Sequence, residues 1–181
     1  SKEQVVKDSN QFSLDIYQRL AKDEEGNIFL SPNSIWTALA MTYAGARGNT
    51  KVEMAKALNY FLDDKALHPS VGKLVRDFND GDRQCELKVA NALWGQIGYP
   101  FKDDFIEINN EHYDAGLNLV DFVSRAPAAR KTINKWVEDN TNKKIKNLIP
   151  ENVLDCDTRM VLTNAIYFKG DWKYTFKKSR T

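Results

Sequence analysis

Residues 160–172 read MVLTNAIYFKGDW, and this stretch says more about the fold than any other. Apolar residues occupy both alternating faces as far as Phe168, which is typical of a central strand in a buried sheet. Asn164 interrupts this pattern on the face that it shares with Leu162 and Ile166. An amide in an apolar row costs free energy unless its hydrogen bonds are satisfied. We therefore expect polar partners for Asn164 inside the fold.

A second strand, over residues 86–94, carries a similar polar interruption. Asn91 shares its face with apolar residues such as Leu93. Ser31 and Ser34 open a helix that is apolar or small almost throughout, so its start is expected to be buried. The sequence predicts either local satisfaction of these groups by the backbone or one polar cluster where the helix start meets the sheet. Such a cluster can fix one arrangement and still let strands part, because hydrogen bonds can be exchanged.

Apolar spacing and turn residues predict the other elements. Pro32 suits the first position of a helix, as does Pro127, and Thr50 with Glu53 matches a capping box. Helices are expected over residues 5–21, 31–48, 50–58, 67–78, 103–113 and 127–142, with further strands over 28–30 and 117–122. This irregular mixture defines an α+β class, and no repeat or linker divides the chain.

Composition excludes several functional classes. The 26 Lys and Arg residues balance 25 Asp and Glu, and 42% of residues are apolar, which is ordinary for a globular protein. This balance argues against a dedicated nucleic-acid or membrane-surface protein. No run approaches the roughly 18 apolar residues that span a bilayer. The basic residues between Arg125 and Lys146 favour a solvated helix face over a polyanion site, which stays a lesser alternative.

Catalytic, metal and cofactor chemistry find no support in the residue pattern. His68, His112, Cys85 and Cys156 are scattered, without the spacing of metal ligands. Residues 45–50 lack the Lys-Ser/Thr ending of a phosphate loop, and no nucleophile elbow is present. We therefore expect no enzyme, no metal and no cofactor. Two cysteines favour reduced thiols over a disulfide.

The two ends of the sequence raise the question of completeness. The first residues carry no signal peptide, as would also be true of a processed secreted chain. Trp172, Tyr174 and Phe176 stand close to the last residue, Thr181, and three aromatic side chains need something to pack against. We expect the chain to be one part of a longer domain.

Three stretches resemble the serpin family, in the family's order. They are NIFLSPNSI at residues 27–35, GARGNT at 45–50 and TNAIYFKGDW at 163–172. The resemblance runs from residue 4 to 181 without a large gap. The sequence VANALWGQ at residues 89–96 looks more like that of prokaryotic serpins than that of animal serpins.

The resemblance implies a specific fold and mechanism. Helices pack around a large, mainly antiparallel sheet, and residues 1–181 form the N-terminal portion of a single serpin domain, with helices A–F and strands 1–3 of the large sheet. Serpins are mostly suicide-substrate inhibitors of serine proteases, and sometimes of cysteine proteases. The cleaved reactive loop inserts into the sheet of a metastable native fold as a new strand. A non-inhibitory serpin with a chaperone, carrier or storage role is the alternative.

The resemblance also implies roles for particular residues. Gly170 and Trp172 match the breach, where the loop first enters the sheet, and the helix over residues 126–142 lies across the sheet and must yield. The reactive site is not in this chain. The implied partners are a target serine protease and a second chain that supplies the C-terminal half of the fold. The implied location is outside the cytoplasm, although a cytoplasmic location stays open. The residues that match the shutter, under the middle of the opening sheet, are Ser31, Ser34, Asn91 and Asn164.

Overall fold

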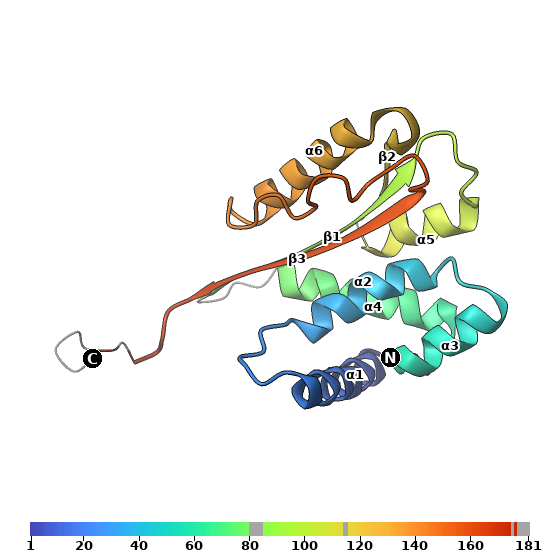
Figure 1. Ribbon diagram of the computed structural model, residues 1–181. Coiled ribbons are helices and arrows are strands. Elements are labelled where there is room, and N and C mark those ends of the chain that lie inside the picture. Colours follow the sequence, from blue (N-terminus) through green and yellow to red (C-terminus); the bar gives the residue numbers. More distant parts are fainter. Residues whose placement is uncertain (80–84, 114–115, 175, 177–181) are drawn as a thin grey trace.

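In the part of the chain that the structure describes, three strands form one sheet, and helices cover both of its faces (Figure 1). The computed structural model describes residues 1–79, 85–113, 116–174 and 176. In chain order the elements are α1 (Lys2–Asp23), α2 (Pro32–Tyr43), α3 (Gly48–Leu58), α4 (Asp64–Asn79), β1 (Cys85–Gln96), α5 (Asp103–Tyr113), β2 (Leu117–Val120), α6 (Phe122–Asn140) and β3 (Met160–Gly170).

The middle strand of the described sheet is β1. It pairs in parallel with β2 from Leu93 to Gln96 and antiparallel with β3 along its length, from Cys85 opposite Gly170 to Gly95 opposite Met160. The expectation of a central strand over residues 160–168 is therefore wrong within the described sheet, where β3 has a neighbour on one side. Within the described residues, its apolar residues face α2 on one side of the sheet and α6 on the other.

Each face of the sheet has its own core. Beneath it, α1, α2 and α4 gather around fully buried Trp36, Met41 and Leu67. On the other face, α6 packs on β1 through Phe122 and Ile133.

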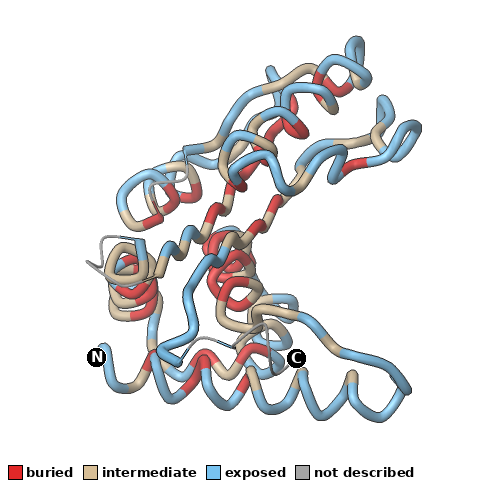
Figure 2. Tube along the Cα trace, turned by 90° about the vertical axis from the view of Figure 1, so that its left-hand side faces the viewer, coloured by how far each residue is buried: buried red, intermediate tan, exposed pale blue. Residues whose placement is uncertain are grey.

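Figure 2 shows buried positions along the strands and on the helix sides that face them. Residues 92–96 of β1 are all buried, whereas in β3 the buried residues Thr163 and Ala165 alternate with less buried ones. This alternation follows from the two-residue period of a strand.

Two local predictions are corrected by the structure. Residues 28–30 form no strand, and Phe29 is 99% exposed, because three apolar residues make a strand only when another strand pairs with them. Thr50 and Glu53 do not form a capping box. The helix begins two residues earlier, with Arg47 as its N-cap residue, so both side chains lie within its first turns.

The start of α6 also differs from the prediction. The helix begins at Phe122, after Asp121, whose carboxylate accepts a hydrogen bond from the backbone N–H of Ser124. Arg125 then leaves the helical conformation (φ −139°, ψ 38°). Pro127 therefore marks the start of the second, longer segment of α6, which ends at Asn140. A helix start at Pro127 was thus correct for this segment alone.

A buried histidine joins α4 to α5. His68 is 1% exposed, and its Nδ1 lies 2.7 Å from the hydroxyl of Tyr113. Its Nε2 has no hydrogen-bond partner within the described residues. Burial is the main cause that lowers the pKa of His68 from 6.5 to about 4, while Asp64 opposes this effect and His112 adds to it. The imidazole is therefore neutral at pH 7.

We expect this histidine to make the fold sensitive to acid. The unfolded chain binds a proton at His68 below about pH 6.5, whereas the folded chain binds it only near pH 4. The free energy of unfolding should therefore fall by up to about 3 kcal/mol as the pH drops through this window. Urea unfolding of the complete domain between pH 7.5 and 4 measures the slope. His68→Gln should flatten it, and an equal slope in His68→Gln would contradict the assignment; His112→Gln is the matched control.

Candidate functional site

The two strand asparagines meet at the centre of the sheet. Asn91 and Asn164 stand directly opposite each other in the β1–β3 register. The amide nitrogen of Asn164 donates to Asn91 Oδ1 at 2.5 Å, to Ser34 Oγ at 2.5 Å and to the Ser34 carbonyl oxygen at 3.0 Å. Two amide hydrogens thus serve three acceptors. The predicted polar cluster exists, and it joins α2, β1 and β3.

Thr37 completes this cluster, and the sequence analysis missed it. The amide of Asn91 donates to Thr37 Oγ1 at 3.3 Å, and the Thr37 hydroxyl donates to the Ser34 carbonyl oxygen at 2.9 Å. Thr37 is fully buried. Thr37 follows Ser34 by three residues, which places both on the same face of a helix, and this spacing could have indicated its role.

Ser31 does not join the cluster. It is the N-cap residue of α2, in front of Pro32, and its side chain makes no capping hydrogen bond. Only its carbonyl oxygen is engaged, by the backbone N–H of Ile35. Among the described residues, the structure thus brings Ser34, Asn91 and Asn164 together, and the Ser31 side chain does not take part in their hydrogen bonds.

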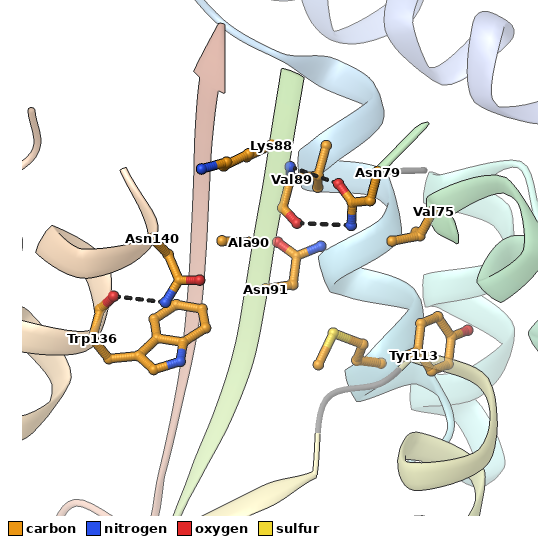
Figure 3. A pocket seen from close by; sticks show the side chains of 10 residues that line it. Val75, Asn79, Lys88, Val89, Ala90, Asn91, Tyr113, Trp136 and Asn140 are labelled. Atoms are coloured by element: carbon orange, nitrogen blue, oxygen red, sulfur yellow. Dashed lines mark hydrogen bonds between the residues drawn. The ribbon is translucent and has the colours of Figure 1, made fainter. Parts of the chain in front are cut away.

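A cavity borders the cluster. Its volume is about 390 Å³, and its lining includes Asn91 of β1, Tyr113 of α5 and Trp136 of α6 (Figure 3). At its rim the Asn79 side chain pairs with Val89 as a neighbouring strand would: Oδ1 accepts from the Val89 N–H at 3.1 Å, and Nδ2 donates to its carbonyl at 3.4 Å. The cavity therefore adjoins the polar cluster at Asn91.

The other two predicted site residues lie at the far end of β3. Gly170 pairs with Cys85, at the opposite end of the ladder from Met160. Trp172 lies beyond the strand, is 73% exposed and makes an edge contact with Phe176 at 5.9 Å between ring centroids. The structure does not join Gly170 and Trp172 to the polar cluster.

The α6 helix makes aromatic contacts on the side that faces the sheet and carries charged residues on the side that faces solvent. Trp136 meets Trp94 at 5.8 Å between ring centroids, and Trp94 Nε1 donates to Thr163 Oγ1 at 3.0 Å. Outside, Lys135 pairs with Asp139. Most basic side chains between residues 125 and 146 are exposed and interspersed with acidic ones, which agrees with a solvated face.

In the parts of the chain that the structure describes, no three His, Cys, Asp or Glu side chains gather in a way that could hold a metal ion. Cys85 and Cys156 are free thiols. None of the described helices combines the length and apolar character needed to cross a bilayer.

Fold and site define an α+β protein with a polar cluster at the centre of its sheet. A family model described as serpin (serine protease inhibitor) matches residues 7–181. The chain belongs to the serpin family.

Relatives agree with this assignment. An uncharacterized serpin-like protein of Methanosarcina acetivorans is 39% identical over 176 residues, which cover 96% of this chain and 42% of that protein. Leukocyte elastase inhibitor of Sus scrofa is 41% identical over 180 residues, covering 99% of this chain and 47% of that protein. The chain therefore spans less than half the length of these relatives.

Solved structures agree as well. Emu ovalbumin matches with a TM-score of 0.87 at 32% identity, covering 97% of this chain and 49% of that one. Cleaved kallistatin complexed with heparin matches with a TM-score of 0.88 at 28% identity, covering 99% and 53%. The fold described above is therefore part of the serpin fold.

Proposed function

We propose that this chain is the N-terminal portion of a single serpin domain that inhibits serine endopeptidases, and in some cases cysteine endopeptidases, as a suicide substrate. The protease cleaves a reactive loop in the C-terminal half and is acylated by it. The cleaved loop then enters the large sheet beside β3 as an additional strand. In this proposal the partners are the target protease and the segment or second chain that completes the domain. The site of action is outside the cytoplasm, with a cytoplasmic site as the alternative.

The polar cluster supports the part of this proposal that concerns opening of the sheet, and the relatives support the inhibitory part. Ser34, Asn91 and Asn164 act as the shutter, because their shared hydrogen bonds can be exchanged when strands part. Gly170 and Trp172 act as the breach. Ser31 has the weakest support among the shutter residues, since its side chain makes no hydrogen bond within the described chain. The leukocyte elastase inhibitors among the relatives point to an inhibitory branch of the family.

A non-inhibitory serpin is the second candidate. The similarity to ovalbumin structures favours it, although that similarity concerns the fold that all serpins share. The polar cluster does not distinguish these two candidates. The residues of the reactive loop and its hinge decide between them, and these lie outside residues 1–181.

A protease challenge of the complete domain tests the proposal. The domain is incubated with serine proteases, elastase among them, and the products are run on a denaturing gel. An inhibitor gives a covalent complex that survives boiling in detergent. Cleavage of the domain by each protease, without any such complex, would overturn the inhibitory proposal and leave the non-inhibitory one. A protease with its active-site serine already blocked is the control.

A further inference from the structure

The first turn of α6 is fastened to β1 by a buried side chain. Gln96 Oε1 accepts hydrogen bonds from the backbone N–H groups of Phe122, at 2.7 Å, and Val123, at 3.0 Å. Phe122 is fully buried, and Gln96 is 7% exposed. The first N–H groups of a helix have no acceptor within the helix itself. Gln96 supplies that acceptor from β1. This end of α6 therefore cannot leave the sheet without losing both of these hydrogen bonds.

Near the opposite end of α6, Val137 is fully buried in a core shared with both strands, and the polar contacts beyond it are made by exposed side chains. Asn142, just beyond the helix, donates to Glu86 Oε1 at 2.9 Å and accepts from Lys88 Nζ at 3.4 Å. Lys88 also pairs with Glu86 at 3.2 Å. The hydrogen bond from Asn142 is the largest of the causes that lower the pKa of Glu86. All three side chains are exposed, so water can replace these contacts at little cost. We call these three residues the latch.

A break in α6 separates the two fastenings. Arg125 has non-helical backbone angles, and Pro127 has no N–H to donate within the helix. Residues 122–124 therefore form a short turn of their own, and residues 126–140 form the longer segment beyond the break. Backbone breaks of this kind are where a hinge can absorb a change in φ and ψ.

We propose that α6 leaves the sheet from its C-terminal end first, with the latch opening and residues 126–140 turning about Arg125 while Gln96 holds the first turn. The inference rests on the proposed function, in which an inserting loop passes under α6. The latch lies near the Cys85–Gly170 end of the sheet, where that loop would enter. The loop would therefore meet the end of α6 that carries the exposed latch before it meets the end that Gln96 caps. Gln96 and Asn142 act as positioning residues for this movement.

Amide hydrogen exchange on the complete domain tests the order of release. Asn142→Gly removes the latch amide and suits the left-handed backbone there (φ 48°). Glu86→Ala removes the latch from the strand side. Each substitution should speed amide exchange at residues 137–141 roughly three- to tenfold, which is the effect expected from losing one or two exposed hydrogen bonds. Exchange at residues 122–124 should not change. Asn140→Ala is the matched control, because that side chain bonds to the Trp136 carbonyl within α6 (Figure 3).

Gln96 gives the complementary test. Gln96→Met should speed exchange at residues 122–124 by more than tenfold, and Gln96→Glu, which keeps an acceptor, should restore protection. Equal acceleration along the whole helix in the latch variants, or none in either, would overturn the proposal. This readout needs no protease. If the domain forms no covalent complex, the proposed function fails while the exchange result still decides which end of α6 opens first.

Discussion

Gly72→Ala is expected to destabilise the domain strongly, because it forces α4 away from α5. A Cβ at Gly72 would lie 1.9 Å from the carbonyl oxygen of His112 and 2.8 Å from its carbonyl carbon. These are backbone atoms, so α4 and α5 would have to move apart, and Arg76 would lose its hydrogen bond to the same carbonyl. In an ordinary helix interior, replacing Gly by Ala stabilises by about 1 kcal/mol. Here the overpacking should destabilise the domain by about 3 kcal/mol or more.

Urea unfolding of the complete domain measures this effect. Gly26→Ala is the matched control, because nothing lies within 4 Å of the position where its Cβ would be. The control should be neutral or slightly stabilising. A Gly72→Ala domain as stable as the wild type would contradict the close approach of α4 and α5.

Asn164→Leu carries the second large effect, because it removes the donor on which the cluster depends. Asn91 Oδ1 and Ser34 Oγ would both lose their hydrogen bond from Asn164. We expect a destabilisation of about 2 kcal/mol and a changed rate of loop insertion or polymerisation. The initial encounter with the protease should be almost unaffected, since the cluster lies beneath the sheet.

Stopped-flow mixing with protease and polymerisation on warming report these rates. Asn10→Leu places the same change on the exposed surface of α1 and serves as control. Combining Asn164→Leu with Asn91→Leu removes both amides, and the double variant should lose less stability than the two single losses predict together. Unchanged insertion kinetics and unchanged thermal behaviour in Asn164→Leu would show the shutter assignment to be wrong.

Sequence reasoning succeeded where a residue conflicted with its surroundings. Asn91 and Asn164 are amides in apolar rows, and that conflict alone indicated a shared polar cluster. Helices with strong spacing, such as α5, were placed with the bounds that the structure has. The class of the fold followed from the same patterns.

Contacts made by residues without such a conflict could not be predicted. Gln96 looks like an ordinary polar residue at a strand end, yet its side chain caps α6 from another element. Ser31 looked like a partner for the cluster, but a preferred N-cap residue need not direct its side chain into the core. The strand predicted over residues 28–30 depends on pairing, which is set by tertiary structure and not by local apolarity.

Thermal unfolding before and after proteolytic nicking of the reactive loop tests the central claim most directly. The complete domain is nicked by a protease that cleaves within the loop, and the unfolding temperatures of the two forms are compared in the same buffer. If the cleaved loop enters the sheet beside β3 as a new strand, the nicked form should unfold at a much higher temperature than the intact one. Equal unfolding temperatures would mean that no strand is added, and would contradict the account of this chain as part of an inhibitory serpin.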